Sequence, residues 1–373
     1  MSFIPKTLLI TGGAGFIGSC FTGLCAKYGA RAIVLDKLTY AGHKANLEWI
    51  PKFPHPSSPA SGGGDIYSPR LRGEIEGGMD GYELIQGDIN DGALVQDLLK
   101  KYAPDAVINF AAESHVDNSI SGPAPFIETN ITGTFRLLDA SLSYWKENKN
   151  PAFRFVQIST DEVYGSLGPQ GAFTETSPIQ PNSPYSASKA AADNLVRAWH
   201  HTYGLPTLIT RCSNNYGPRQ FPEKLIPHMI SCATSGKPLP VYGDGGNVRD
   251  WIHVEDHSAG IWLALTRGTP GEVYNFGGHA EMNNLALVKQ LCALLDIQRP
   301  RADGKSYVQQ ISFVADRLGH DRRYAIDDTK AQEQLGFTRN YNDFAKGLAA
   351  TVEWYLANEA WCQAVSEQKR KSA

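Results

Sequence analysis

The sequence predicts an α/β fold in which helices cover both faces of a doubly wound parallel sheet, with a smaller α/β domain toward the C-terminus. Three observations carry this prediction. Short apolar runs alternate with amphipathic stretches from residue 7 to residue 211, a glycine-rich turn follows the first run, and 373 residues exceed what one core usually holds. We therefore expect a first domain over residues 1–211 and a second over 212–373, partly interleaved with the first.

The glycine-rich turn has the sequence GGAGFIG (12–18) and directly follows the apolar run 7–11. The pattern G-x-G-x-x-G fits from Gly13, and a phasing through Gly12, Gly15 and Gly18 fits equally well. Glycines at such a turn let backbone N–H groups approach a pyrophosphate at the N-terminus of the following helix. The turn therefore predicts a Rossmann-type dinucleotide site.

The next apolar run, residues 31–35, ends in an acidic residue, Asp36. A carboxylate at this point of a dinucleotide-binding fold bonds the ribose hydroxyls and would repel a 2'-phosphate. Lys37 beside it partly offsets that repulsion. The pattern predicts NAD, rather than NADP, as the cofactor.

Regular alternation of strands and helices then continues. Residues just after parallel strands face the cofactor, which places Asp88 beside the adenine and Ala111-Ala112 against the nucleotide. His115 is either a turn residue or a sugar contact. The helices near 131–147 and 187–203 cover the sheet, and they would also form a dimer bundle if their outer faces were apolar. Apolar runs predict strands over 82–86, 106–110, 155–159 and 207–211, and helical spacing predicts helices over 93–102, 131–147 and 187–203.

The run FVQIS (155–159) ends in Thr160, Asp161 and Glu162, and Tyr185 and Lys189 follow on the next helix. Four residues apart, the tyrosine and the lysine share one helix face, so the ammonium can approach the phenol. An unperturbed phenol has a pKa of about 10, and a nearby cation favours the phenolate. Tyr185 therefore suits a proton acceptor for an alcohol undergoing oxidation, although such a pair also arises by chance on helices.

Composition argues against several kinds of partner. With 35 basic and 38 acidic residues, a net charge of -3 gives no electrostatic basis for binding nucleic acid or an anionic membrane. No apolar run approaches the ~20 residues of a membrane span, and no signal-peptide pattern is present. Six scattered cysteines without CxxC or paired histidine spacing predict free thiols, a reducing cytoplasmic location and no metal site.

Two further segments stand out by composition. Residues 51–81 are rich in Pro, Gly and Ser and have no sustained period, which predicts a mobile surface insertion. Beyond residue 211, basic and aromatic residues cluster in FPEKL (221–225), RDW (249–251) and DRLGHDRRY (316–324). Separated arginines beside aromatic rings suit a diphosphate and a stacked base, whereas each one singly is typical of a surface ion pair.

Together these segments resemble the extended short-chain dehydrogenase/reductase superfamily over nearly the whole chain, and closely its dTDP-glucose 4,6-dehydratases. STDEVYG (159–165) is the specific part, because epimerases of the superfamily lack its acid pair and the related decarboxylases carry Ser at the position of Asp161. The other resembling segments are TGGAGFIGS, NFAAESHVDNSI, PYSASKAAADNLV, RCSNNYGPRQFPEKLIP, VYGDGGNVRDWIHVED and D-R-x-G-H-D-R-R-Y-A-I-D.

The resemblance implies a lyase that uses NAD to convert dTDP-glucose into dTDP-4-keto-6-deoxyglucose, with a substrate-binding C-terminal domain. Tyr185, assisted by Lys189 and Thr160, would take the proton of the hydroxyl on carbon 4. Glu162 would remove the hydrogen on carbon 5, and Asp161 would protonate the hydroxyl leaving carbon 6. Adjacent carboxyls suit these roles only with one of them protonated, and like charges close together push their pKa values apart.

The resemblance also implies the binding residues. The cofactor contacts would be Gly12, Gly15, Phe16, Ile17, Gly18, Asp36, Lys37, Thr39, Asp88, Ile89, Ala111, Ala112, Ser114, Thr129, Tyr185, Lys189 and Asn215. The sugar nucleotide contacts would be Ser114, Thr160, Asn214, Lys224, Leu225, Pro240, Tyr242, Arg249, Asn284, Asp316, Arg317 and His320. This chain departs from the family pattern at Asn118 (usually Arg), at Leu318 (usually Pro) and in the length of the 51–81 insertion.

Other functions remain open from the sequence. One is a UDP-glucose 4,6-dehydratase, since the sequence does not identify the base. A UDP-glucuronate decarboxylase or a hexose epimerase would share the scaffold, but neither needs an acid such as Asp161 to expel water from carbon 6. A non-catalytic NAD(H) sensor would have no use for Tyr185, Lys189 and the acid pair.

Overall fold

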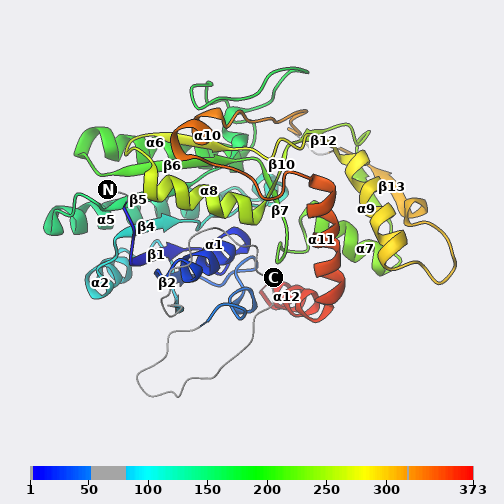
Figure 1. The fold of residues 1–373 in the computed structure, drawn as a ribbon, viewed down its shortest axis with the longest axis horizontal. Coiled ribbons are helices and arrows are strands. Elements are labelled where there is room, and N and C mark those ends of the chain that lie inside the picture. The colour runs from blue at the N-terminus through cyan, green and yellow to red at the C-terminus, as the bar shows by residue number, and fades with distance from the viewer. Residues whose placement is uncertain (1–2, 52–80, 317–318, 373) are drawn as a thin grey trace, which may run out of the picture.

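The computed structural model describes residues 3–51, 81–316 and 319–372, and a seven-stranded parallel sheet lies at its centre (Figure 1). The strands are β1 (Thr7–Thr11), β2 (Arg31–Asp36), β3 (Tyr82–Gln86), β4 (Ala106–Asn109), β5 (Arg154–Ile158), β6 (Thr207–Cys212) and β11 (Val273–Phe276). Their order, β11-β6-β5-β4-β1-β2-β3, reverses direction between β1 and β4. The predicted doubly wound α/β fold is confirmed, and ligands of such sheets bind at this reversal.

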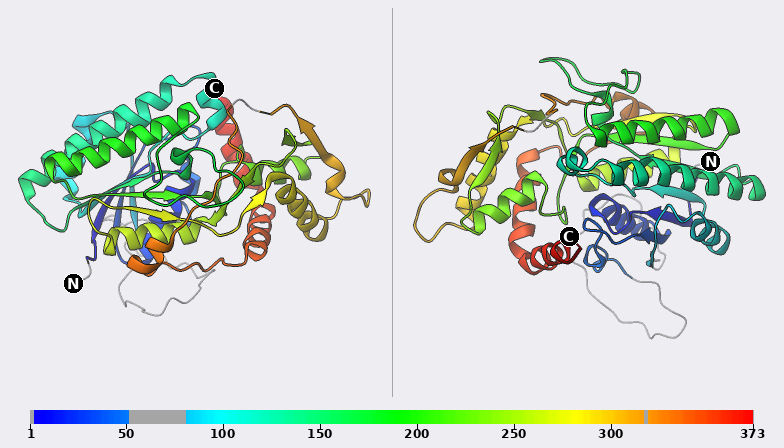
Figure 2. Two further views of the ribbon diagram at one scale, coloured as in Figure 1. Left: turned by 90° about the horizontal axis from the view of Figure 1, so that it is seen from above. Right: turned by 180° about the vertical axis from the view of Figure 1, so that it is seen from behind.

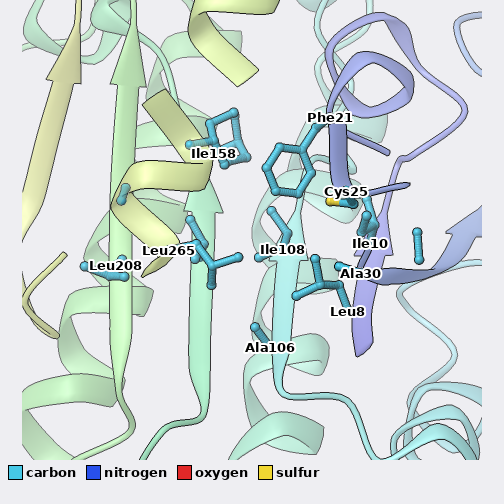
Figure 3. Packing of buried hydrophobic residues seen from close by; sticks show 14 of the residues in the cluster. Leu8, Ile10, Phe21, Cys25, Ala30, Ala106, Ile108, Ile158, Leu208 and Leu265 are labelled. Carbon is cyan, nitrogen blue, oxygen red and sulfur yellow. The ribbon is translucent and has the colours of Figure 1, made fainter. Parts of the chain in front are cut away.

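Helices cover both faces of the sheet (Figure 2). Helices α1 (Phe16–Lys27) and α8 (Val254–Arg267) pack on one face, and α2 (Gly92–Tyr102), α5 (Thr134–Asn148) and α6 (Pro184–Tyr203) pack on the other. On the first face, Ile10, Ile108 and Ile158 from three neighbouring strands meet Phe21 of α1 and Leu265 of α8 (Figure 3). Because both faces are buried, the strands carry continuous apolar runs, as expected for parallel sheets.

Two predicted helix starts differ from the observed ones by three residues, and that of α2 differs by one. Helix α6 begins at Pro184, three residues before the predicted start, because Ser183 caps it: its Oγ accepts the N–H of Ser186 at 3.0 Å. Helix α5 begins at Thr134 and is preceded by the π-helix η2 (Ile127–Gly133), where a standard helix was predicted from residue 131. Within η2 the Asn130 side chain bonds both backbone groups of Glu113, which holds the loop after β4.

The chain after residue 211 completes the sheet and also builds a second core. Strand β11 and helix α8 join the main sheet layers, whereas α7 (Leu225–Thr234), α9 (Asn284–Gln298) and α11 (Phe344–Ala357) enclose a separate apolar cluster at one side (Figure 1). The domain division at residue 211 stays a prediction. The other elements here are β7 (Asn214–Tyr216), β8 (Leu239–Tyr242), β9 (Val248–Arg249), β10 (Trp251–His253), β12 (Met282–Asn283), η4 (Tyr307–Gln310), β13 (Ile311–Val314), α10 (Thr329–Leu335) and α12 (Glu359–Ser372).

Short elements connect the sheet to the loops at its carboxyl edge. They are η1 (Lys44–Asn46), α3 (Val116–Ser121), α4 (Ala124–Phe126) and η3 (Asp161–Tyr164). Most of the predicted 51–81 insertion, residues 52–80, lies outside the described residues. Among the residues that are described, no helix has the length and apolarity needed to cross a membrane.

Candidate active site

A cavity of about 350 Å³ lies at the carboxyl edge of the sheet, where residues directly after β1 to β6 line it. All seventeen residues predicted to contact the cofactor line this cavity. So do Thr160, Asp161, Glu162 and the predicted substrate contacts Asn214, Lys224 and Leu225. The structure thus brings the cofactor set and the acid pair to one place, as parallel strands ending at one edge require.

The structure distinguishes the two phasings of the glycine turn. Gly12 has φ +68°, and a Cβ there would lie 2.6 Å from the backbone nitrogen of Ala111, so only glycine fits. A Cβ at Gly18 would overlap the carbonyl oxygen of Gly12. Gly13 instead faces the Val34 side chain in the core and is absent from the cavity lining. The phasing Gly12, Gly15, Gly18 is therefore the one that faces the cavity.

The turn and the acid after β2 are held together by backbone hydrogen bonds. Asp36 accepts the N–H of Ala14 at 2.9 Å and the N–H of Leu38 at 2.8 Å. Burial raises the pKa of Asp36, and these two N–H groups offset part of the rise. Lys37 forms an ion pair with Asp88 across 2.7 Å, and both residues line the cavity.

The acid pair occupies η3, immediately after β5. Asp161 is 2 % exposed, and its Oδ2 has no hydrogen-bond partner among the described residues. Burial, with the charges of Glu162 and Asp250, raises the pKa of Asp161 well above its usual value, and Arg249 and the Thr160 hydroxyl offset only part of this. Asp161 therefore favours its protonated form, as a proton donor must.

Tyr185 and Lys189 lie on the first two turns of α6 and both line the cavity. Burial, and then the charge of Glu162, raise the pKa of Tyr185 well above its usual value, and a hydrogen bond with Thr160 lowers it in part. The Lys189 ammonium donates to the carbonyl of Ile158 at 2.7 Å, not to the phenol. Among the described residues no hydrogen bond joins this ammonium to the phenol, so the predicted approach of the two groups stays a prediction.

A buried ion pair beneath the cavity ties η3 to α6. Arg211 of β6 donates its Nε to Asp193 of α6 at 2.9 Å and its Nη1 to the Tyr164 hydroxyl of η3 at 2.9 Å. The Tyr164 hydroxyl in turn donates to the Asn275 amide oxygen of β11 at 2.9 Å. Burial lowers the pKa of Lys189, and the Asp193 carboxylate raises it in part. Arg211 therefore orients both η3, which contains the acid pair, and α6, which contains Tyr185 and Lys189.

The remaining predicted substrate contacts form a second group in the C-terminal part, outside the lining of the cavity. Tyr242 and His320 meet edge to face at 6.5 Å, and Asp316 accepts from His320 at 2.6 Å. Arg249 donates to the carbonyl of Asp321 at 3.0 Å and stacks on Tyr324 at 4.3 Å. Arg249 connects this second group to the residues of the cavity, because its charge lowers the pKa of Asp161 in part. Pro240 lies in β8 and Asn284 begins α9, whereas Arg317 and Leu318 lie outside the described residues.

Three cavity residues lie in segments that the sequence analysis singled out but are absent from its predicted contacts. The Ser159 hydroxyl, the Ser213 hydroxyl and the Trp251 indole N–H line the cavity and are buried without a hydrogen-bond partner among the described residues. Ser159 and Ser213 directly follow β5 and β6, so the rule that ligands meet strand carboxyl ends could have found them. Trp251 belongs to the cluster RDW (249–251), and the pairing of β10 with β7 brings it to the cavity.

The residues that line the cavity fit a bound dinucleotide. A cradle that excludes a Cβ at Gly12, a helix α1 whose N-cap Gly15 has no side-chain bond, and a carboxylate after β2 match a pyrophosphate and a ribose. Ser159, Ser213 and Trp251 border the cavity, and their side-chain polar atoms have no hydrogen-bond partner among the described residues. Among the described residues, no group of three or more His, Cys, Asp or Glu could hold a metal ion.

Asp161→Asn should stabilise the fold, and more so as pH rises. A carboxyl whose pKa is raised in the fold contributes most below its unfolded pKa, and this contribution is lost as pH rises through the folded pKa. Between these two values the stability of the variant relative to wild type should grow by about 1.4 kcal/mol per pH unit. Urea unfolding at pH 5, 6 and 7 measures this, with Asp139→Asn on the exposed side of α5 as control. A pH-independent difference would show that Asp161 ionises normally.

Known proteins with similar sequences include dehydratases of nucleotide sugars. Residues 70–351 match the family model described as GDP-mannose 4,6 dehydratase. The dTDP-glucose 4,6-dehydratase of Xanthomonas campestris pv. campestris (strain B100) is 53% identical over 362 residues, 96% of this chain and 95% of that protein. The dTDP-glucose 4,6-dehydratase 1 of Escherichia coli (strain K12) is 46% identical, across 95% of this chain and 94% of that protein.

Solved structures give the same result. DesIV, a dTDP-glucose 4,6-dehydratase of Streptomyces venezuelae solved with NAD and TYD bound, is 42% identical with a TM-score of 0.81, covering 96% of this chain and 100% of that one. A UDP-glucose 4-epimerase of Thermotoga maritima solved with UDP-glucose has a TM-score of 0.78 at 26% identity, covering 95% of this chain and 100% of that one. With half of its residues shared with such relatives along almost its entire length, this chain belongs to the dTDP-glucose 4,6-dehydratase family of the extended short-chain dehydrogenases/reductases.

Proposed function

We propose that the chain is an NAD-dependent lyase that converts dTDP-glucose into dTDP-4-keto-6-deoxyglucose. The observation that carries this proposal is the buried Asp161, placed beside Glu162 and Tyr185 at a cavity that fits a dinucleotide. The high identity to dTDP-glucose 4,6-dehydratases supports the same reaction. NAD, when bound, accepts the hydride from carbon 4 and returns it to carbon 6.

Tyr185 and Thr160 handle the first proton. The hydroxyl on carbon 4 gives its proton to Tyr185, and the Thr160 hydroxyl, which lowers the pKa of Tyr185 in part, stabilises the phenolate. Because burial and Glu162 raise the pKa of Tyr185, the phenol must first lose its own proton to solvent, and the positive charge that NAD would bring beside it would favour that loss. Lys189, buried one turn further along α6, adds positive charge to the same wall of the cavity.

Glu162 and Asp161 handle the elimination. A ketone at carbon 4 acidifies the hydrogen on carbon 5, which Glu162 removes. Asp161, held protonated by its burial, gives its proton to the hydroxyl that leaves carbon 6 as water. Asp161 acts as the acid and Glu162 as the base because Asp161 is buried and Glu162 is only partly buried.

Decarboxylase and epimerase functions are less consistent with the site, because neither reaction expels water and neither uses an acid at position 161. The UDP-glucose 4-epimerase of Thermotoga maritima has a similar fold, so the fold alone does not select between these reactions. A non-catalytic NAD(H) sensor gives no reason for a buried carboxyl in the cavity whose Oδ2 has no hydrogen-bond partner among the described residues. A UDP-glucose 4,6-dehydratase remains the second candidate, since Arg317 and Leu318, in the predicted nucleotide-binding segment, lie outside the described residues.

Incubation with dTDP-, UDP- and GDP-glucose tests this function directly. We expect the fastest turnover with dTDP-glucose and a product that absorbs strongly in alkali, as a 4-keto-6-deoxy sugar does. Carbon dioxide release from UDP-glucuronate, or galactose formation from UDP-glucose without alkali absorbance, would replace the proposal by a decarboxylase or an epimerase. No reaction with any of the sugars would support the sensor.

Glu162→Gln should abolish the entry of solvent deuterium at carbon 5, because an amide does not accept the carbon-bound proton. Asp161→Asn, which keeps Glu162, should instead slow product formation while carbon 5 still exchanges. Mass spectrometry of substrate and product in deuterium oxide follows both variants. Undiminished exchange in Glu162→Gln would assign the base to another residue.

We further propose a homodimer formed through α5 and α6, in a cytoplasmic protein. Phe135, Trp199 and Tyr203 form a ladder of edge-to-face rings along these helices, and Tyr203 is exposed. The exposed positions of α5 are polar, Arg136 and Asp139 among them, so the outer face is not the purely apolar one envisaged for a bundle.

All six cysteines are free thiols, as in reducing compartments, and recovery of the chain from a secreted fraction would contradict a cytoplasmic location.

Sedimentation velocity tests the dimer. We expect about twice the mass of the 40.8 kDa chain, and a shift toward the monomer in Tyr203→Glu, which places a charge beside the ring ladder. Tyr28→Glu, at the C-cap of α1 on the opposite face of the sheet, is the comparison variant. A wild-type chain that sediments as a monomer at micromolar concentration would refute the dimer.

A further inference from the structure

The last helix of the chain reaches the glycine turn through two hydrogen bonds. Trp361 of α12 donates its indole N–H to the Asn46 amide oxygen at 3.1 Å, across 315 residues of sequence. The Asn46 amide N–H in turn donates at 2.8 Å to the carbonyl of Ala14, in the middle of the glycine turn. The N–H of that same Ala14 donates to Asp36. We call the path Trp361–Asn46–Ala14 the C-terminal latch.

The hydrogen bonds of the C-terminal latch are buried. Asn46 is 1 % exposed, so loss of either bond would leave an amide group without water to replace it. Val365, one turn after Trp361, is 1 % exposed, and α12 lies beside the segment that follows β2 (Figure 1). The Trp361 ring also packs edge to face on Trp354 at 5.2 Å. The helix is therefore docked by packing, and the indole N–H adds a directional bond.

Helix α11, which precedes α12, contacts another part of the cavity lining. The Tyr355 hydroxyl donates to the carbonyl of Gln220 at 2.7 Å, and Gln220 lines the cavity. Beside it, the Arg219 guanidinium lies between the Trp49 ring at 4.5 Å and the Trp354 ring at 5.4 Å. Arg219 has φ +69°, a conformation that side-chain-bearing residues keep only when their surroundings enforce it. Contacts from α11 and α12 thus reach two parts of the chain that border the cavity, Gln220 and the glycine turn.

We propose that the C-terminal latch is a positioning device for the cofactor: Trp361 and Asn46 hold the glycine turn in its binding conformation and slow the release of NAD. The inference rests on the proposed function in taking NAD as the ligand. Neither residue lines the cavity, so both act through the backbone of Ala14. A reaction without net oxidation gains from a cofactor that stays bound between turnovers, which gives such a device a use.

Trp361→Phe tests the latch, because phenylalanine keeps an aromatic ring and removes only the N–H. The full chain is loaded with radiolabelled NAD and diluted into excess unlabelled NAD, and the retained label is followed by filter binding. We expect release about threefold to tenfold faster than from wild type, the effect of one lost hydrogen bond. Turnover at saturating NAD and the affinity for dTDP should not change, which separates positioning from general damage.

Trp145→Phe is the matched control, since the Trp145 indole also donates to a backbone carbonyl, that of Asn150 at 3.1 Å, at the end of α5. Its release rate should equal that of wild type. Equal release from Trp361→Phe and wild type would overturn the latch, and so would equal acceleration in both tryptophan variants. Failure of the wild-type chain to bind NAD would overturn the latch together with the proposed function, whereas the other two outcomes leave that function intact.

Asn46→Ser provides a second, independent variant, because it removes both bonds of the latch at once. We expect faster release from Asn46→Ser and no further acceleration when Trp361→Phe is added, since the partner of the indole is already gone. Additive effects of the two substitutions would contradict a single path through Asn46.

Discussion

The site depends on one constraint: a carboxyl group kept away from water at the end of a central strand. Asp161 sits at the carboxyl end of β5, between β4 and β6, where the sheet and its helices exclude solvent. Burial and the neighbouring acids raise its pKa, and Arg249 only partly compensates. An acid that holds its proton beside Glu162 gives the cavity a donor and an acceptor from two adjacent residues.

The acid pair needs rigid support, which the buried ion pair of Arg211 and Asp193 provides. Arg211 neutralises Asp193 and bonds Tyr164, so the turn with the acid pair and the helix with Tyr185 and Lys189 share one anchor. Ion pairs this deep add little to net stability, but breaking one leaves an uncompensated charge. We infer that the pair mainly holds the site in one geometry.

The same scaffold serves different chemistry in its relatives. A UDP-glucose 4-epimerase at 26% identity has a TM-score of 0.78, close to the 0.81 of a dehydratase at 42%. Sheet order and helix packing are thus common to both, and the side chains at the carboxyl edge carry the difference. In this chain we propose that the acid at position 161 is that difference.

The amino-acid sequence by itself determined the sheet, the glycine turn and the residues along the cavity. Continuous apolar runs such as 31–35 and a glycine that must adopt positive φ are local properties, readable from residue type and spacing. It also predicted Asp36, Asp88, Thr160 and Tyr185 at one edge, because parallel strands end on the same side.

Only the tertiary structure decided which partners those residues have. It turned the Lys189 ammonium to the Ile158 carbonyl, chose the Gly12 phasing, and brought Trp251 and Trp361 from distant segments against the cavity and its turn. It also set the pKa directions of Asp161 and Tyr185. Burial and long-range hydrogen bonds depend on how separate elements pack, and no local pattern of residues encodes that packing.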